Sequence, residues 1–312
     1  MPQLPETRVV VLAGPTASGK SEVALELAER LQGEIVSVDS MQVYRGMDIG
    51  TAKPTPADRA RVPHHLLDVV DPWESFDVAR FVALARGVLA DLARREKWAI
   101  LCGGTGLYFK ALAQGLGEAP APDPELRARL ESTPLADLLQ ELAERDPVTF
   151  ARIDRRNLRR VVRAVEVIRL TGRPYSEQRA RWSLQDWPTS WQGHLFGLAR
   201  SPEDLRQRIN ARVDRMFQLG LVEETRRLLQ QGVRPGSTAW QALGYRQVRE
   251  FLEGRRSLTE TVALVKLRTR QFAKRQMTWF RGQMPLHWLD VLPETPAKTV
   301  AESILSRLHD RA

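Results

Sequence analysis

Short apolar runs alternate with amphipathic stretches along the first third of the chain. Val9–Ala13, Glu34–Val38 and Trp98–Cys102 are runs of the length of a buried strand. The stretches Lys20–Leu31 and Val78–Arg95 repeat apolar residues at the spacing of a helix with one buried face. Strands and helices that alternate in this order form a parallel sheet covered by helices. The pattern therefore predicts an α/β fold with a doubly wound parallel sheet.

The pattern changes in the middle of the chain. Gly117–Pro124 is rich in proline and predicts a hinge, and the residues that follow it show helical patterns dense in arginine. A later apolar run, His194–Ala199, indicates a strand that returns to the sheet. We therefore expect an all-helical insertion domain at residues 120–192, within an α/β core formed by residues 1–119 and 193–312.

The C-terminal part of the core reads as a layer of helices. Helical patterns extend over Pro202–Gln231, Trp240–Glu253 and Leu258–Arg281. A short apolar run, His287–Val291, could add a last strand to the sheet. We expect these helices to cover the α/β core.

A glycine-rich turn joins the first predicted strand to the first predicted helix. It has the spacing of a Walker A loop, or P-loop, and consists of Gly14, Pro15, Thr16, Ala17, Ser18, Gly19, Lys20 and Ser21. Glycines in such a loop let backbone N–H groups face phosphate oxygens, while the helix N-terminus and the lysine add positive charge. We therefore predict a core like that of the P-loop NTPases, a diphosphate or triphosphate bound at this loop, and Mg²⁺ held by Ser21.

The carboxylate that hydrolysis of a nucleotide would need is missing from its usual place. The third predicted strand leads into Gly103, Gly104 and Thr105, without the acid that holds Mg²⁺ and organises water in NTPases. The nearest acid is Asp39, directly after the strand Glu34–Val38. Because ligands of such sheets bind at the carboxyl ends of the strands, Asp39 is a candidate catalytic group. Its alternative role is to cap the turn that follows.

The chain of 312 residues has a net charge of +9, because its 47 lysines and arginines outnumber its 38 acidic residues. An excess of this kind points to a polyanionic partner if the basic residues are clustered. Arg156, Arg159, Arg160 and Arg163 recur at three- and four-residue spacing, which predicts one helical face suited to RNA phosphates. A solvated helix surface is the alternative for this stripe.

A second basic element, Lys266–Arg281, interleaves lysine and arginine with aromatic residues. Basic side chains can hold an RNA backbone while aromatic faces stack on unpaired bases. Part of the aromatic set must pack in the core, and we expect this of Phe272 and Trp279, which lie seven residues apart.

Several classes of protein are disfavoured by the composition. The single cysteine, Cys102, excludes an intramolecular disulfide and a cysteine metal site within the chain, and we expect it in the core. The adjacent His64 and His65 lack further ligands at zinc spacing. No apolar stretch could cross a bilayer and no leader begins the chain, so we expect a cytoplasmic protein without a membrane partner. No protein partner is evident from the sequence, and we expect a monomer.

Five blocks of sequence stand out along the chain: Asp39–Pro54, Pro63–Asp68, Gly103–Tyr108, Gly244–Gln247 and Thr269–Arg281. In their residues and their order, over nearly the whole chain, they resemble the bacterial tRNA dimethylallyltransferases, also called tRNA isopentenyltransferases. The resemblance implies transfer of a prenyl group from dimethylallyl diphosphate to the N⁶ amine of the adenosine immediately 3′ of the anticodon in tRNA. With its single cysteine, the chain is expected to lack the zinc finger of the eukaryotic relatives.

The resemblance also implies a role for individual residues. Asp39 matches the family's general base, which takes a proton from a weakly nucleophilic amine. Thr105 matches a position that contacts the target nucleotide, and Arg212 joins Lys20 and Ser21 with Mg²⁺ around the diphosphate. Arg208, one helical turn from Arg212, is the alternative for that last position.

The family's tRNA contacts fall on residues from all parts of the chain. They correspond to Asp39, Ser40, Met41, Gln42, Thr105, Arg127, Arg159, Arg160, Arg163, Gln241, Gly244, Tyr245, Arg246, Lys274, Arg275, Gln276, Trp279 and Arg281. At Asp154–Asn157 the chain departs from the usual family pattern, so within the stretch Arg152–Val167 residue roles are carried over only after Asn157.

Three other functions share part of these features. A P-loop small-molecule kinase would use the same loop, and an isopentenyltransferase acting on free adenine nucleotides would share the N-terminal chemistry. Neither needs the arginine stripe or the basic and aromatic element. An RNA-binding ATPase would need the missing acid.

Overall fold

The computed structural model describes residues 7–233 and 238–309, which fall into two compact units. The first combines Met1–Ala113 with Ser183–Ala312, and the second is Gln114–Trp182. The second unit thus begins and ends earlier than the insertion expected at 120–192. One reason is Trp191, which is fully buried in the first unit beside β1 (Val9–Ala13).

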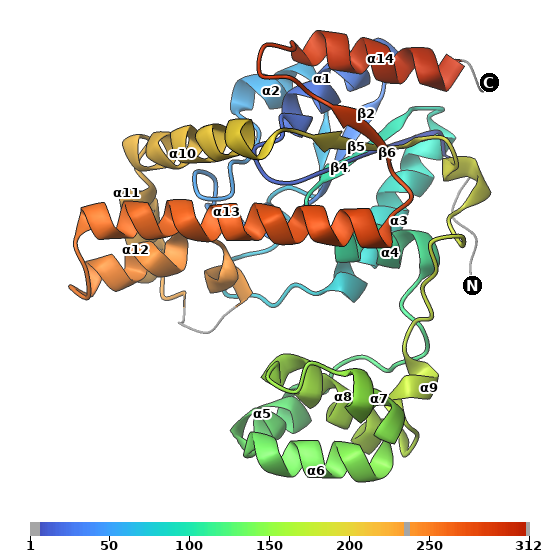
Figure 1. Cartoon of the computed structure of the whole chain (residues 1–312), viewed down its shortest axis with the longest axis vertical. Helices are drawn as coiled ribbons and strands as arrows, with labels where there is room; N and C mark the ends of the chain where they lie inside the picture. Colours follow the sequence, from blue (N-terminus) through green and yellow to red (C-terminus); the bar gives the residue numbers. More distant parts are fainter. Residues whose placement is uncertain (1–6, 234–237, 310–312) are drawn as a thin grey trace. The chain divides into compact units, whose positions relative to one another are not determined.

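The first unit is built on a six-stranded sheet with strand order β3-β2-β4-β1-β5-β6, and every strand pair is parallel (Figure 1). Its further strands are β2 (Glu34–Val38), β3 (His64–His65), β4 (Ala99–Gly103), β5 (Leu195–Ala199) and β6 (His287–Asp290). The predicted α/β fold with a P-loop core is confirmed. The strand β3 was not predicted, because two residues are too few to show the alternating pattern of a strand.

Helices cover both faces of this sheet and form the C-terminal layer. They are α1 (Lys20–Leu31), α2 (Pro56–Arg61), α3 (Val78–Arg94), α4 (Gly106–Gln114), α10 (Pro202–Gln218), α11 (Leu221–Gln230), α12 (Tyr245–Leu252), α13 (Leu258–Gln283) and α14 (Ala297–His309), with short 3₁₀ turns at Thr189–Trp191 and Thr238–Gln241. Asp77, Ser201 and Ser257 each accept a hydrogen bond from a first-turn N–H, which fixes where α3, α10 and α13 begin.

Two helical predictions need correction. The expected helix Pro202–Gln231 is two helices, because Gly220 between them has a φ of 99°, a conformation that favours glycine and ends α10. Helix α14 was not predicted; it lies beside α1 on one face of the sheet (Figure 1). Val300, Ala301 and Ile304 of α14 join the core formed by β1, α1 and β5.

The second unit is a small helical bundle with a core of its own. Its helices are α5 (Pro124–Ser132), α6 (Leu135–Arg145), α7 (Pro147–Arg152), α8 (Leu158–Thr171) and α9 (Tyr175–Gln178). Leu130, Leu138, Leu142, Val161 and Val165 are fully buried in its centre. Along the described part of the chain, no helix is long and apolar enough to cross a membrane.

Candidate active site

The P-loop connects the carboxyl end of β1 to α1. Ala17 and Gly19 have positive φ angles of 64° and 94°, and the Ser18 N–H donates to Pro15 O, so the loop wraps tightly. The first N–H groups of α1 have no acceptor within the helix. Together these features make the backbone of the loop a cradle for an anion, as the sequence predicts.

Two arginines hold this loop from its outer side. Arg208 Nε donates to Ala17 O over 2.9 Å and Arg200 Nε donates to Ser18 O over 2.8 Å. Arg200 is almost fully buried and is itself paired with Asp204. Because C=O and N–H point in opposite directions across a trans peptide, these contacts turn the next N–H groups toward the cradle. Sequence reasoning did not find Arg200, which no motif marks.

Polar groups inside the loop are left for a ligand. Ser18 Oγ is fully buried and has no hydrogen-bond partner among the described residues. Lys20 Nζ folds back to Pro15 O over 2.9 Å, and burial lowers the pKa of this ammonium. Ser21 lies exposed at the start of α1. An orphaned hydroxyl and an ammonium on one loop rich in backbone N–H groups fit a phosphate group.

Asp39 and Thr105 lie on neighbouring loops at the carboxyl edge of the sheet. β2 and β4 are paired, with Val38 opposite Gly103, so the two loops leave the sheet side by side. Asp39 Oδ1 accepts from Met41 N at 2.8 Å and Gln42 N at 3.3 Å. The capping role considered for Asp39 is therefore real, but Asp39 Oδ2 accepts no hydrogen bond from the described residues and can act on a substrate.

The loop after Asp39 is braced by its own side chains. Ser40 N donates to the Thr105 hydroxyl at 3.1 Å. Gln42 accepts from Ser37 Oγ and donates to the carbonyls of Thr51 and Ala52. Met41 is half-buried. Gln42 was expected to contact RNA, but its side-chain amide makes its hydrogen bonds within the protein.

Arg212 shares the site with Asp39 and Lys20. Burial lowers the pKa of the Arg212 guanidinium, while Asp39 and Glu22 act in the opposite direction. Burial and the nearby Arg212 charge lower the pKa of Lys20, whereas Cys102 and Asp39 act to raise it. Arg208 instead grips the outer side of the P-loop. The two arginines that sequence left as alternatives thus make different contacts in the structure.

Cys102 lies behind this site at the end of β4. Its thiol is within 3.7 Å of Lys20 O and packs on the core, as expected. Burial raises the pKa of this thiol to about 11. Cys102 is therefore a protonated packing residue and not a nucleophile at neutral pH.

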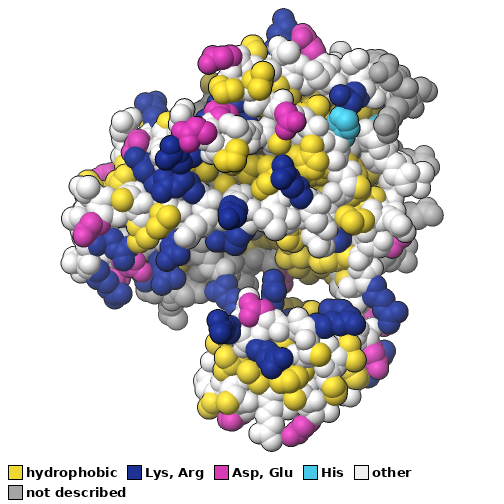
Figure 2. All heavy atoms as spheres, viewed as in Figure 1, with side chains coloured by type: hydrophobic (Ala, Val, Ile, Leu, Met, Phe, Trp, Pro, Cys, Tyr) yellow, Lys and Arg dark blue, Asp and Glu magenta, His cyan; other side chains and the backbone are white. Residues whose placement is uncertain are grey.

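Helix α13 carries basic side chains on its outer side. Lys274, Arg275 and Arg281 are exposed, and Figure 2 shows Lys and Arg side chains among hydrophobic ones over this region. A hollow of about 590 Å³ runs along the same helix, lined by Gln271, Lys274, Arg275, Thr278, Trp279 and Gln283. The expected packing of Phe272 is wrong: its ring is 36% exposed, 6.0 Å from the Arg275 guanidinium. Trp279 is half-buried, and a Cβ at Gly106 would lie 2.1 Å from its ring.

Two predicted RNA-contact residues at the start of α12 lie inside the protein. Tyr245 is fully buried and donates to Glu224 Oε1, and Gly244 is buried with a φ of 97°. Glu224 also accepts the N–H groups of Asp48, Ile49 and Gly50. The Tyr245 side chain therefore fastens this loop to α11 and is not placed to touch RNA, whereas Gln241 and Arg246 are exposed.

The arginine stripe of α8 divides into two groups. Arg159 and Arg160 are exposed, and Arg156 precedes the helix, whose N-cap is Asn157. Arg163 and Arg127 both donate to Glu166, which is fully buried. Arg163 also donates to Pro120 O in the hinge. Arg127 and Arg163 therefore hold the second unit together, a role that sequence spacing does not reveal.

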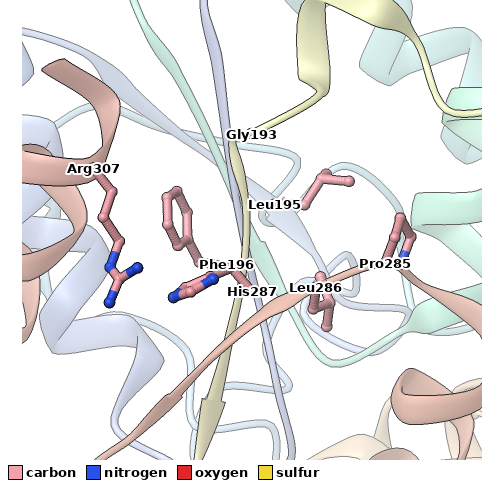
Figure 3. Close-up of a pocket in the computed structure, with 7 residues that line it drawn as sticks. All are labelled: Gly193, Leu195, Phe196, Pro285, Leu286, His287 and Arg307. Atoms are coloured by element: carbon pink, nitrogen blue, oxygen red, sulfur yellow. The ribbon is translucent and has the colours of Figure 1, made fainter. Parts of the chain in front are cut away.

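A separate pocket of about 420 Å³ lies at the opposite edge of the sheet (Figure 3). It is lined by Gly193, Leu195, Phe196, Pro285, Leu286, His287 and Arg307. These residues lie at the amino ends of β5 and β6 and on α14, whereas the P-loop follows the carboxyl end of β1. None of the predicted site residues lines this pocket.

Comparison with known proteins identifies the family. A family model described as IPP transferase matches residues 42–283, and one described as isopentenyl transferase matches residues 7–67. The chain belongs to the IPP transferase family. The family resemblance seen in the sequence is confirmed.

Relatives of this IPP transferase align over almost their full length. The chain is 48% identical over 305 residues to a tRNA dimethylallyltransferase of Geobacter metallireducens, covering 96% of each. It is 46% identical over 283 residues to tRNA dimethylallyltransferase 1 of Citrifermentans bemidjiense, covering 91% of this chain and 92% of the relative.

Solved structures agree with the fold of this IPP transferase. The tRNA isopentenylpyrophosphate transferase of Bacillus halodurans superposes with a TM-score of 0.70 at 38% identity, over 97% of each chain. A eukaryotic dimethylallyltransferase acting on tRNA gives a TM-score of 0.81 at 28% identity, over 98% of this chain and 80% of that one.

The residues present fit Mg²⁺ bound through a substrate. The described residues contain no group of three His, Cys, Asp or Glu that could cage a metal ion. Mg²⁺ is commonly held by one or two protein groups together with substrate phosphates. The exposed Ser21 hydroxyl at the mouth of the cradle is suited to that arrangement in this IPP transferase.

Proposed function

We propose that this IPP transferase is a tRNA dimethylallyltransferase. It would transfer the dimethylallyl group of dimethylallyl diphosphate to the N⁶ amine of the adenosine immediately 3′ of the anticodon. The observation that carries this proposal is the grouping of Lys20, Asp39 and Arg212 around the P-loop, where β4 supplies no acid for water activation. The names of the relatives support the same reaction.

The reaction breaks a carbon–oxygen bond of the donor and forms a carbon–nitrogen bond to adenine. The P-loop N–H groups, Lys20 and Arg212 would bind the diphosphate and stabilise the charge that grows as it leaves. Asp39 Oδ2 would accept the proton that the amine loses as its new bond forms. Ser21 would hold Mg²⁺, which supplies further positive charge to the diphosphate oxygens.

The target adenosine must leave the stack of the anticodon loop to reach Asp39. Exposed residues of α12, of the turn Thr238–Gln241 before it, and of α13 and α8 are suited to hold the RNA during this step. We assign RNA contacts to Gln241, Arg246, Lys274, Arg275, Arg281, Arg159 and Arg160, with Asp39, Ser40, Met41, Thr105 and Trp279 nearer to the reacting base. We further propose that the enzyme acts as a monomer in the cytoplasm.

A second candidate is prenylation of free adenine nucleotides, because the isopentenyl transferase model matches residues 7–67. One experiment separates the two. The protein is incubated with labelled dimethylallyl diphosphate and Mg²⁺ together with an unmodified tRNA transcript, with AMP, or with ATP. We expect label on the transcript only, and none when the adenosine 3′ of the anticodon is replaced by guanosine. Label on AMP and none on tRNA would overturn the proposal.

A further inference from the structure

The side chain of Gln276 lies between two loops of the active site. Its Oε1 accepts the N–H of Thr16 over 2.9 Å, and its Nε2 donates to the carbonyl of Gly104 over 2.9 Å. Thr16 belongs to the P-loop, and Gly104 directly precedes Thr105. One amide therefore connects the loop that would hold the donor to the loop beside the target nucleotide.

The fit around this amide is close. Gln276 is only 8% exposed, so water has little access to replace its two hydrogen bonds. A Cβ at Gly104 would lie 2.3 Å from Gln276 Nε2, so a glycine is needed there to admit the amide. An amide has both a donor and an acceptor, and this position uses both.

The helix that carries Gln276 has two different sides at this point. Lys274 and Arg275 are exposed, whereas Gln276 and Phe280 face the interior. Trp279 packs against Gly106, one residue beyond Thr105. Helix α13 thus presents basic groups to the outside and grips both active-site loops from the inside.

We propose that Gln276 is a positioning residue that holds the donor loop and the Thr105 loop at the spacing that prenyl transfer requires. It is not an RNA ligand, although it lies within a sequence block expected to touch tRNA. This inference rests on the proposed function. A shift of about 1 Å between reacting groups can lower a rate by about a hundredfold, so loss of the bridge should act on the chemical step.

The test compares Gln276→Leu with Gln207→Leu, which removes an exposed glutamine of α10 that pairs with Glu203. Single-turnover prenylation is measured with both substrates saturating, and Kd is measured for tRNA and for the donor. For Gln276→Leu we expect a rate ten- to a hundredfold lower, with the tRNA Kd within about twofold of wild type. Gln207→Leu should match wild type in all three measurements.

A second variant covers the case in which Gln276→Leu does not fold. Gly104→Ala places a methyl group where the amide lies and displaces it without changing Gln276. We expect the same loss of rate at unchanged tRNA affinity. A tRNA Kd weakened tenfold with a normal rate at saturation would make Gln276 an RNA ligand and overturn the inference. Prenylation rates within twofold of wild type in both variants would also overturn the inference. Wild-type protein that prenylates no tRNA would instead refute the proposed function.

Discussion

The backbone N–H of Ser40 donates to the Thr105 hydroxyl over 3.1 Å, which joins the loops that follow β2 and β4. The bond lies one residue from Asp39, whose Oδ1 is fixed by the N–H groups of Met41 and Gln42. The two oxygens of the Asp39 carboxylate thus differ in their surroundings. Oδ1 orders the loop, and Oδ2 accepts no hydrogen bond from the described residues.

This division makes Asp39→Asn the sharpest test of the proposed base. An asparagine keeps the acceptor for Met41 N but cannot take a proton. We expect the single-turnover rate of prenylation to fall by at least about a hundredfold, with Kd for tRNA and donor nearly unchanged. Asp39→Ala, which also removes the turn acceptor, should in addition lower the thermal unfolding midpoint. A near-normal rate in Asp39→Asn would remove Asp39 from the role of base.

Lys20→Ala should show a different pattern. Lys20 would contact the diphosphate both before and during transfer, so its loss affects binding as well as rate. We expect a higher donor Kd together with a lower single-turnover rate, measured by calorimetry and rapid quench. Lys298→Ala, which removes an exposed lysine of α14, serves as the control and should change neither. An unchanged donor Kd in Lys20→Ala would show that the diphosphate binds elsewhere.

Local patterns in the sequence located the P-loop and its neighbouring elements well. The bounds of β1, α1 and β2 match those read from the sequence, because hydrophobic periodicity and the Gly-Lys-Ser turn are local signals. Asp39 and Thr105 could also be placed, since parallel strands bring their carboxyl ends to one edge of the sheet.

Contacts between distant parts of the chain could not be read in the same way. Thr16 and Gln276 are 260 residues apart, and Gly50 and Glu224 are 174 apart. A glutamine or glutamate on a helix gives no local sign that it will accept a backbone N–H elsewhere. Family motifs marked Gln276 and Tyr245, but a motif does not tell whether a residue touches the substrate or supports a loop.

Tyr245→Phe tests the supporting role of Tyr245. Its hydroxyl donates to Glu224 in a buried hydrogen bond and accepts the Gly50 N–H in a partly buried one, and both bonds are lost in the variant. We expect the free energy of unfolding to fall by about 1–2 kcal/mol in a urea titration. Affinity for tRNA should stay within about twofold. Loss of tRNA affinity without loss of stability would instead place this hydroxyl on the RNA.

The decrease in the free energy of unfolding at acid pH should depend on Glu34. Hydrogen bonds from Arg95 and His65 lower the pKa of this carboxyl to about 2, although burial acts to raise it. Its usual pKa is 4.5. The ionised Glu34 carboxylate, with its partners Arg95 and His65, therefore stabilises the fold above about pH 4.5. This contribution is lost as the pH falls toward 2.

The effect of Glu34 can be isolated with Glu34→Gln. Because Arg95 is partly solvated, we expect a loss of roughly 1–2 kcal/mol at pH 7 and a shallower fall in stability between pH 4.5 and 2. Urea titrations across this range measure it, and Glu96→Gln, at an exposed glutamate, is the control. Parallel pH curves for Glu34→Gln and wild type would contradict the assignment.

Substitutions in the two groups of arginines of the second unit should have different effects, one on RNA binding and the other on stability. Arg159 and Arg160 are exposed, so Arg159→Ala with Arg160→Ala should remove phosphate contacts and leave the fold intact. Each lost contact should reduce the slope of log K against log salt concentration by about 0.7 to 0.9, measured with full-length tRNA. Arg169→Ala is the matched control, because Arg169 lies about two and a half turns beyond Arg160, on the opposite side of α8, and pairs with Glu141.

Arg163→Ala should instead act first on stability. It leaves the buried Glu166 with Arg127 as its remaining ion-pair partner among the described residues and removes the contact to Pro120 O. Partial loss of a buried ion pair should cost about 1–3 kcal/mol of unfolding free energy, seen as an earlier thermal transition. The salt slope should stay closer to wild type than in the Arg159 and Arg160 double variant. If Arg163→Ala flattened the slope as strongly as the double variant without changing stability, all three arginines would form one phosphate-binding face. An unchanged slope in every variant would leave α8 as a solvated surface, with the RNA held by α12 and α13.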